Sequence, residues 1–269
     1  MVQIVGIVNL TSDSFSDGGR YLETGAAIAH GERLVGGGAH WLDLGPESSN
    51  PAGARVPDEV QLARLRPVLR HFVAAGVKVS VDTHRPAVMA AALDDGASMI
   101  NDITAVADPQ AAAVLARYPQ AQVVLMFARN ARARAEAVPR PYRDLLPEVL
   151  AFFRTRLAAL ADLGIDPGRT LLDPGMGFFL GSNAEPSLWM LRHLGSLGVL
   201  GRPLYVSTSR KSFVGALVAR PPLERGAGTL ASELWAAQAG ASFIRTHDAR
   251  ALADALAVWT AIAGVAPTE

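Results

Sequence analysis

The sequence contains no cysteine, so disulfide bonds, thiolate nucleophiles and cysteine–metal sites are all excluded. It also lacks an excess of either charge, because 25 Lys and Arg residues balance 25 Asp and Glu residues. Without a net positive charge, the chain has no general attraction for nucleic acid or for an anionic membrane. We therefore expect neither of these partners.

Long apolar runs and targeting signals are missing as well. No run reaches the roughly 18 residues that a membrane-spanning helix needs. The opening MVQIVGIVNL has no basic segment, no long apolar segment and no small-residue cleavage site. The expected location is therefore the cytoplasm. What the chain has instead is 269 residues, 50% of them hydrophobic, which is enough for a large buried core.

Short β-rich runs recur along the chain, and most are followed by an amphipathic helical pattern. The predicted strands are 3–8, 41–44, 77–82, 98–102, 122–126, 170–173, 203–207 and 242–246. Strand–helix units of this number and total length predict one domain, residues 1–269, folded as a (β/α)8 TIM barrel. Pro67 interrupts one helical pattern and should bend that helix or end its first half.

An open, doubly wound sheet is the alternative fold. It would be expected to show a GxGxxG fingerprint after the first strand, but NLTSDSFSDGG follows that strand here. The barrel is therefore the favoured architecture.

Nearly every predicted strand ends in a polar side chain. These residues are Asn9, Asp43, Asp82, Asn101, Asp173, the run from Ser207 to Ser212, Arg245 and His247. In this fold the chemistry lies at the carboxyl ends of the strands. A single residue of this kind could be structural, but buried unpaired carboxylates and amides cost several kcal/mol each. A polar ligand in the barrel mouth would satisfy the whole set.

The types of polar residue differ around the mouth. Hydroxyl and cationic groups follow strands 203–207 and 242–246, which is the usual phosphate site of this fold. Asp82, Asn101 and Asp173 offer acceptors and an amide that suit a flat heterocycle with ring NH and amino groups. The pattern predicts a phosphorylated heterocycle as ligand. No His and carboxylate triad for a transition metal stands out, whereas Mg²⁺ held mainly by phosphate oxygens is compatible.

Six motifs closely resemble dihydropteroate synthase. They are GIVNLTSDSFSDGGRY (6–21), SVDT (80–83), IND (100–102), DPGMGF (173–178), SRKSFVG (209–215) and RTHD (245–248). The resemblance runs from the first strand to the last and implies a (β/α)8 fold. It also implies a transferase of folate biosynthesis that joins 7,8-dihydropterin pyrophosphate to p-aminobenzoate, giving 7,8-dihydropteroate and pyrophosphate. Mg²⁺ as cofactor and a homodimer are implied as well.

The resemblance further implies a role for each matching residue. The pterin ring would be bound by Asp82, Asn101, Asp173, Phe178 and Lys211. Pyrophosphate would be bound by Asn9, Ser48, Ser49, Arg245 and His247, with Asn9 also contacting the metal. The p-aminobenzoate pocket would include Phe15, Ser49, Asn50, Pro51, Phe179 and Ser212. Asp82, Lys211 and Arg245 would be the catalytic residues. The family reaction is dissociative, with pyrophosphate leaving before the aniline nitrogen attacks.

Three positions depart from the housekeeping pattern of the family. Asn50 stands where arginine is expected, Phe127 stands near the expected histidine of strand five, and Phe179 stands where glycine is expected. The GPESSNP and DPGMGFFLG runs resemble the sulfonamide-insensitive (Sul-type) synthases, although residues 104–108 lack the Gly-Phe-Pro of that type. We expect reduced sulfonamide sensitivity, with Phe179 narrowing the second-substrate pocket so that the sulfonyl group of a drug clashes.

Two other functions remain open. A pterin-binding methyltransferase module would need no pyrophosphate clamp, so Lys211, Arg245 and His247 count against it. A catalytically weak pterin-binding paralogue is favoured by Asn50 and Phe127. The retained polar set at the strand ends counts against this second alternative.

Overall fold

A computed structural model of the chain describes residues 2–10, 24–47, 55–129 and 138–264. Within these ranges eight parallel strands form a closed barrel, in which each strand pairs with the next and β8 pairs with β1. The strands are β1 (Gln3–Asn9), β2 (Trp41–Gly45), β3 (Lys78–Asp82), β4 (Met99–Asp102), β5 (Gln122–Met126), β6 (Thr170–Asp173), β7 (Leu204–Val206) and β8 (Ala241–Thr246). The predicted (β/α)8 barrel is confirmed, and the open sheet is excluded.

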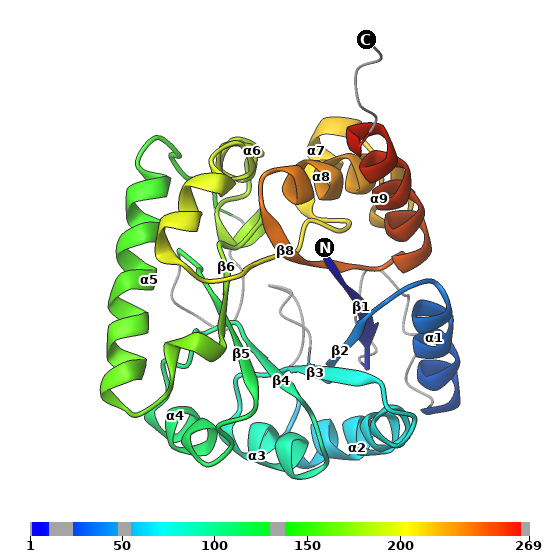
Figure 1. Ribbon diagram of the computed structural model, residues 1–269, viewed down its shortest axis with the longest axis vertical. Helices are drawn as coiled ribbons and strands as arrows, with labels where there is room; N and C mark the ends of the chain where they lie inside the picture. The colour runs from blue at the N-terminus through cyan, green and yellow to red at the C-terminus, as the bar shows by residue number, and fades with distance from the viewer. Residues whose placement is uncertain (1, 11–23, 48–54, 130–137, 265–269) are drawn as a thin grey trace.

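The helices surround the ring of strands, as Figure 1 shows. They are α1 (Thr24–Gly36), α2 (Asp58–Ala74), α3 (Pro86–Asp94), α4 (Pro109–Ala116), α5 (Leu145–Asp162), α6 (Glu185–Arg192), α7 (Ser212–Val218), α8 (Gly226–Gln238) and α9 (Ala249–Gly264). Short 3-10 helices are η1 (Pro167–Arg169), η2 (Gly177–Phe179), η3 (Leu194–Leu200) and η4 (Pro222–Glu224). Among the described residues, none of these helices combines the length and apolar character needed to cross a membrane.

Helix α2 contains Pro67 in its interior and continues through it. The expectation that the helix could end there is wrong. Proline removes the N–H that would bond the carbonyl of Ala63. Pro67 and Ala63 are both exposed, so water can reach that carbonyl and the helix tolerates the proline.

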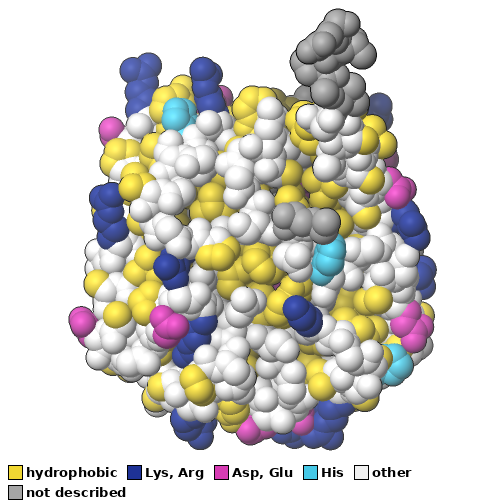
Figure 2. Space-filling model, in the orientation of Figure 1, with side chains coloured by type: hydrophobic (Ala, Val, Ile, Leu, Met, Phe, Trp, Pro, Cys, Tyr) yellow, Lys and Arg dark blue, Asp and Glu magenta, His cyan; other side chains and the backbone are white. Residues whose placement is uncertain are grey.

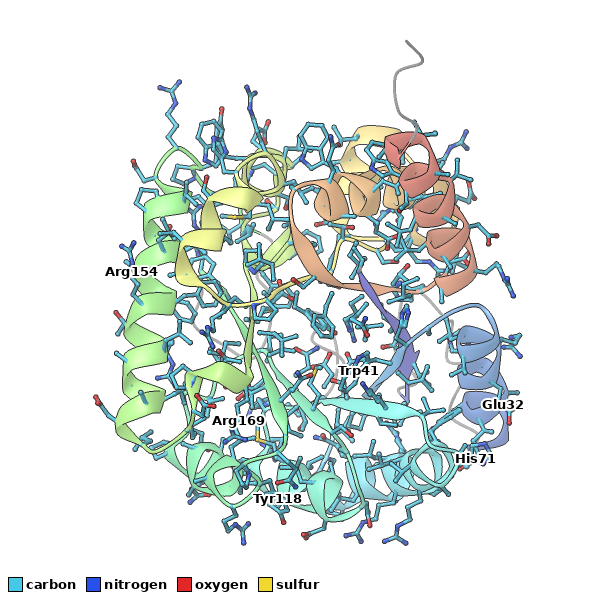
Figure 3. All side chains as sticks on the ribbon, in the orientation of Figure 1. Glu32, Trp41, His71, Tyr118, Arg154 and Arg169 are labelled. Atoms are coloured by element: carbon cyan, nitrogen blue, oxygen red, sulfur yellow. The ribbon has the colours of Figure 1, made fainter. Side chains whose placement is uncertain are left out.

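An apolar layer fills one end of the barrel interior. Each of its members comes from a different strand: Val5, Trp41, Met99, Val124, Leu171, Tyr205 and Phe243. Trp41 lies within the ring of strands in Figure 3, and apolar side chains gather over the middle of the face shown in Figure 2. Because successive side chains of a strand point to opposite faces, this layer shows which strand positions face inward.

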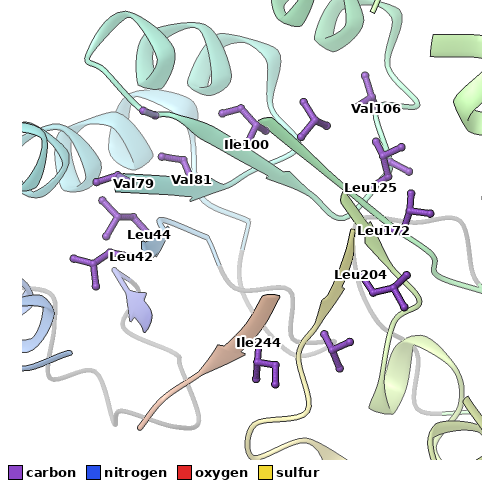
Figure 4. Close-up of a cluster of buried hydrophobic side chains, with 14 of the residues drawn as sticks. Leu42, Leu44, Val79, Val81, Ile100, Val106, Leu125, Leu172, Leu204 and Ile244 are labelled. Carbon is purple, nitrogen blue, oxygen red and sulfur yellow. The ribbon is translucent and has the colours of Figure 1, made fainter. Parts of the chain in front are cut away.

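The alternating positions of the same strands face outward and pack against the helices. Leu42 and Leu44 of β2 and Val79 and Val81 of β3 belong to this outer core, shown in Figure 4. Leu65 of α2 is buried in the same cluster. Burying one such side chain contributes about 1.5–3 kcal/mol, so the outer core holds the helices on the barrel.

Beyond the apolar layer, the inward positions of most strands are polar, whereas Ile7 of β1 and Met126 of β5 stay apolar. Two residues further along their strands stand Asp43, Asn101, Asp173, Ser207 and Arg245. The strict alternation that buries the apolar layer therefore also directs these side chains into the barrel at its carboxyl end. This end of the barrel is the candidate active site.

Candidate active site

Arg245 is the centre of a hydrogen-bonded network in the barrel mouth. Its Nε donates to Asp43 Oδ2 at 2.6 Å, and its Nη2 donates to Asp82 Oδ2 at 3.1 Å. Asn101 Nδ2 donates to the same Asp43 oxygen at 3.2 Å. The structure thus brings together Asp82, Asn101 and Arg245, three residues that the sequence assigned to one site.

Asp43 received no role in the sequence analysis, although it was one of the polar strand ends. It is fully buried and lies between Ile7 of β1 and Ser80 of β3 in the strand register. The available sequence signal was its place two residues after Trp41 in a strand whose alternate positions are apolar. That pattern marks an inward position, but it does not reveal the partners.

Asp173 is held at the end of β6 by a tight turn. Its Oδ1 accepts a hydrogen bond from the backbone N–H of Gly175 at 2.8 Å. Gly175 has φ +72, and a Cβ there would lie 2.3 Å from the carbonyl oxygen of Phe127. Only glycine allows this conformation and this close approach, so the Asp-Pro-Gly sequence fixes the direction of the carboxylate.

Burial shifts the pKa values of the three titratable groups around the network. It raises the pKa of Asp82 to about 7, against the lowering effect of Arg245, and it raises the pKa of Asp173 to about 6. Burial and the nearby Arg245 lower the pKa of Lys211 to about 8. Burial also lowers the pKa of Arg245, but Asp43 and Asp82 outweigh it and leave that pKa above its usual value. Such shifted groups in a concave site are typical of binding and catalysis.

The backbone that carries Lys211 is held by Arg225. The Arg225 Nη1 donates to the carbonyl oxygens of Arg210 at 2.8 Å and Lys211 at 3.1 Å, and its Nε donates to that of Arg220 at 2.8 Å. A Cβ at Gly215 would lie 2.2 Å from the Arg225 guanidinium. The glycine of the SRKSFVG motif therefore provides the space in which the arginine sits against the loop.

The two phenylalanines of η2 lie in different environments. Phe179 is 6% exposed and packs with Ile103, Met126 and Ala128, whereas Phe178 is 36% exposed. The Nζ atom of Lys211 lies 4.9 Å from the centre of the Phe179 ring. Phe179, the residue that departs from the housekeeping pattern, is thus the ring next to the pterin-binding candidates.

His247 is tied to the loop after β7. Its Nδ1 lies 2.9 Å from Ser209 Oγ, and its backbone N–H donates to the same oxygen at 3.2 Å. Burial and the nearby Arg210 and Arg245 lower the pKa of His247 well below its usual value, so the imidazole is neutral at pH 7. In the tautomer in which Nδ1 accepts from Ser209 Oγ, the other ring nitrogen carries the proton and can donate to an anion.

Phe127 points away from the barrel mouth. It is buried in the outer core, and its ring packs edge-on against Phe152 of α5 with centroids 5.2 Å apart. The neighbouring Met126 and Ala128 are the side chains that cluster with Phe179. This geometry removes a reason to connect Phe127 with weak catalysis, because its side chain packs on a helix.

The remaining candidates divide into two groups. Phe15, Ser48, Ser49, Asn50 and Pro51 lie outside the described residues. Asn9 stands at the end of β1, and Ser212 begins α7, where its buried Oγ has no partner among the described residues. In the described parts of the chain, no group of three or more His, Cys, Asp or Glu side chains could hold a metal ion.

The shifted pKa values predict a bell-shaped pH profile for kcat/KM of the pterin substrate. Asp173 and Asp82 accept hydrogen bonds as carboxylates, so activity should rise through about pH 6 to 7. It should fall above about pH 8, where Lys211 loses its proton. Steady-state kinetics from about pH 5 to about pH 9 measure this profile, which reports groups of the free enzyme.

Lys211→Arg is the matched variant for this profile. A guanidinium does not titrate in the measured range, so the alkaline limb should disappear while the acid limb stays. A wild-type profile without limbs, or an alkaline limb unchanged in the variant, would contradict the assignment.

Comparisons with known proteins show similarity in sequence and fold. A family model described as "Pterin binding enzyme" matches residues 5–247. The chain is 47% identical over 261 residues to dihydropteroate synthase type-2 of Escherichia coli, covering 96% of this chain and 95% of the relative. It is also similar to two solved structures of Xanthomonas albilineans dihydropteroate synthase. The one with 4-aminobenzoic acid has a TM-score of 0.89 and 42% identity, covering 98% of this chain and 94% of the other. The one with 7,8-dihydropteroate has a TM-score of 0.83 and 38% identity, with the same coverage.

Proposed function

The chain belongs to the pterin-binding enzymes and, within them, to the dihydropteroate synthases, and we propose that the inward polar residues of its barrel mouth carry out the family reaction. The enzyme condenses 6-hydroxymethyl-7,8-dihydropterin pyrophosphate with p-aminobenzoate, giving 7,8-dihydropteroate and pyrophosphate. The observation that carries the assignment of the site is the Arg245 network, which joins residues from four strands at one end of the barrel.

The pterin ring is proposed to bind edge-on to Asp82, Asn101 and Asp173. Two carboxylates and an amide match the amino group and ring NH groups of a pterin. Lys211 adds a cation on the same side of the mouth, where its ammonium lies over Phe179. Phe178 remains a proposed pterin contact, supported by its partly exposed ring.

Departure of pyrophosphate is the step at which the cationic groups act. In a dissociative reaction, negative charge grows on the leaving group, and prearranged cations and donors at that position lower the barrier. Arg245 and the neutral His247 are proposed to take this role, with Ser48 and Ser49 as further contacts. Asp82, Lys211 and Arg245 are the proposed catalytic residues.

A Mg²⁺ cofactor fits the donor set only if phosphate oxygens supply most of its ligands. Mg²⁺ commonly binds through one or two protein oxygens together with substrate phosphates and water. Asn9, at the carboxyl end of β1, offers one amide oxygen on this side of the mouth. We therefore propose Asn9 as the protein ligand, and the bound ion would neutralise charge on the leaving pyrophosphate.

The p-aminobenzoate pocket is proposed to lie beside η2. A Cβ at Gly177, the first residue of η2, would lie 3.0 Å from Ser212 Oγ, so the η2 turn and the start of α7 are in direct contact. Phe179 and Ser212 would line the pocket from this side. Phe15, Ser49, Asn50 and Pro51 are proposed to complete it.

Reduced sulfonamide sensitivity is proposed to arise from Phe179. Phe179→Gly should lower the Ki of a sulfonamide by about tenfold relative to the KM of p-aminobenzoate, since one steric contact discriminates by about 1–3 kcal/mol. The ratio of the two constants is the measurement, because loss of packing on Ile103 and Met126 affects both ligands. Phe178→Gly is the adjacent control and should leave the ratio unchanged. If Phe179→Gly also leaves it unchanged, Phe179 serves only as packing.

We also propose a cytoplasmic homodimer, as the family resemblance implies. Apolar side chains on neighbouring elements support the dimer: Leu217 and Val218 of α7, Leu223 of η4 and Trp235 of α8 are all exposed. Trp235 is 53% exposed even though its Nε1 donates to the carbonyl oxygen of Leu191. Such a patch is typical of a surface that contacts another protein chain.

Pyrophosphate release tests the function directly. Purified protein given the dihydropterin pyrophosphate, Mg²⁺ and p-aminobenzoate should release pyrophosphate above a heat-inactivated control. Release at only the control rate, together with measurable pterin binding, would instead support the catalytically weak paralogue.

A further inference from the structure

Asp43 is the most deeply buried member of the Arg245 network. Its side chain is 0% exposed, whereas Asn101 is 7% exposed and the side chains of Arg245 and Asp82 are 14% and 25% exposed. It nevertheless accepts hydrogen bonds from two proposed substrate-binding residues, Asn101 and Arg245, through a single oxygen atom.

The position of Asp43 is a poor one for stability alone. Its Oδ1 is buried and has no partner among the described residues, and the same is true of the neighbouring Ser80 Oγ. A buried carboxylate with an unsatisfied oxygen costs free energy, and an apolar residue of similar size would fill the barrel at lower cost. The carboxylate therefore calls for an explanation other than packing.

Its first effect is on Asn101. With Asp43 Oδ2 accepting from Nδ2 at 3.2 Å, the amide has one allowed orientation. The flipped amide would place its oxygen against the carboxylate, which is two acceptors in contact. Asp43 thus determines which atoms of Asn101 face a ligand above it.

Its second effect is on Arg245. The bonds to Asp43 and Asp82 use Nε and Nη2, so the guanidinium is held at two corners by carboxylates from adjacent strands. A guanidinium group held at two nitrogens keeps its orientation while negative charge develops on the leaving pyrophosphate. Prearrangement of this kind is what makes a cation effective in stabilising a leaving anion.

We propose that Asp43 is a positioning residue, which fixes the amide of Asn101 for pterin recognition and the guanidinium of Arg245 for pyrophosphate departure. This inference rests on the proposed function of the site. It assigns two separable effects to one buried carboxylate, and each effect has its own measurement.

Asp43→Asn tests the proposal, because it keeps the size of the side chain and removes its charge. Pterin affinity, measured by calorimetry, should fall about 10-fold through the loss of the fixed amide, and kcat should fall about 10-fold or more through Arg245. The KM of p-aminobenzoate should change less than about twofold. An equal loss for both substrates would indicate general structural damage and overturn the proposal, as would unchanged pterin affinity and kcat.

A second test adds Asp43→Asn to an Arg245→Met variant and compares the double variant with Arg245→Met alone. In it, Asp43→Asn should still weaken pterin binding, because Asn101 remains, but should lower kcat by less than about twofold, because there is no guanidinium to position. This double variant also removes both charges together, so it tests the proposal even if Asp43→Asn alone does not fold. A further tenfold loss of kcat in the double variant would show that Asp43 does not act through Arg245.

Asp95→Asn, at the end of α3 outside the barrel, is the matched control. Asp95 also pairs with two arginines, Arg66 and Arg70, but far from the barrel interior. Its replacement should leave kcat and pterin affinity unchanged. Absence of pyrophosphate release by the wild-type enzyme would contradict the proposed function. An active wild-type enzyme and an Asp43→Asn variant with unchanged kcat and pterin affinity would contradict only this inference.

Discussion

Asp173→Ala will lower the affinity for the dihydropterin pyrophosphate by about 10²–10⁴-fold. A hydrogen bond to a charged acceptor contributes about 1.5–3 kcal/mol, and a carboxylate facing a pterin edge can accept two. Asp173 is buried at the end of β6, and its direction is fixed by the Gly175 N–H. Isothermal calorimetry with the pterin substrate measures the loss. Retained affinity would show that the heterocycle sits elsewhere.

The chain supplies its own control for this variant. Asp166-Pro167-Gly168 repeats the Asp-Pro-Gly sequence of the Asp173 turn, and Asp166 Oδ1 accepts from the Gly168 N–H at 2.7 Å. This second turn precedes β6, at the opposite end of the same strand. Asp166→Ala should therefore remove the same local hydrogen bond and leave pterin affinity within about twofold. Equal losses in the two variants would mean that Asp173 matters only as a turn residue.

Arg245→Gln will lower kcat by about 10²–10³-fold, the range found when one prearranged donor to a developing charge is removed. The variant also leaves Asp43 and Asp82 without their shared cation, so unfolding should become easier. Single-turnover measurement of pyrophosphate release separates the chemical step from binding. The expected result is a slow chemical step even at saturating pterin substrate.

Arg169→Gln is the comparison for Arg245→Gln. Arg169 is a partly buried arginine at the other end of the barrel, labelled in Figure 3, and it donates to the carbonyl oxygens of Leu115, Tyr118 and Ala121. Its replacement should lower the melting temperature without changing kcat at a temperature where the protein is folded. A similar loss of kcat in both variants would show that Arg245 acts through stability.

The fold could be predicted from the sequence because the strand signal is local. The run WLDL predicted a strand at 41–44, and the observed β2 adds only Gly45. The side of the barrel that each strand residue faces was predictable too, because alternation is a property of the chain itself. The polar residues were accordingly expected at the correct end of the barrel.

What the sequence could not supply were relations between distant residues. The contact of Asp43 with Arg245 joins positions 202 apart and depends on how the barrel closes. Phe178 and Phe179 follow Gly177, which has a positive φ. The neighbouring sequence does not predict this backbone conformation, and so it does not predict which of the two rings is buried. Pro67 is the opposite case. The local sequence rule says that proline interrupts a helix, but α2 continues through Pro67 because the freed carbonyl of Ala63 is exposed to water.

The shared bonds of the Arg245 network have a consequence for inhibitor design. Arg245 donates to Asp43 and Asp82, and Asn101 donates to Asp43, so changing any one of the four disturbs a partner in the proposed substrate site. The apolar side chains around Phe179 are held by packing alone, so a substitution among them leaves no charged or amide partner unpaired. A compound that competes with the pterin should therefore leave fewer viable escape mutations than one that competes with the aniline.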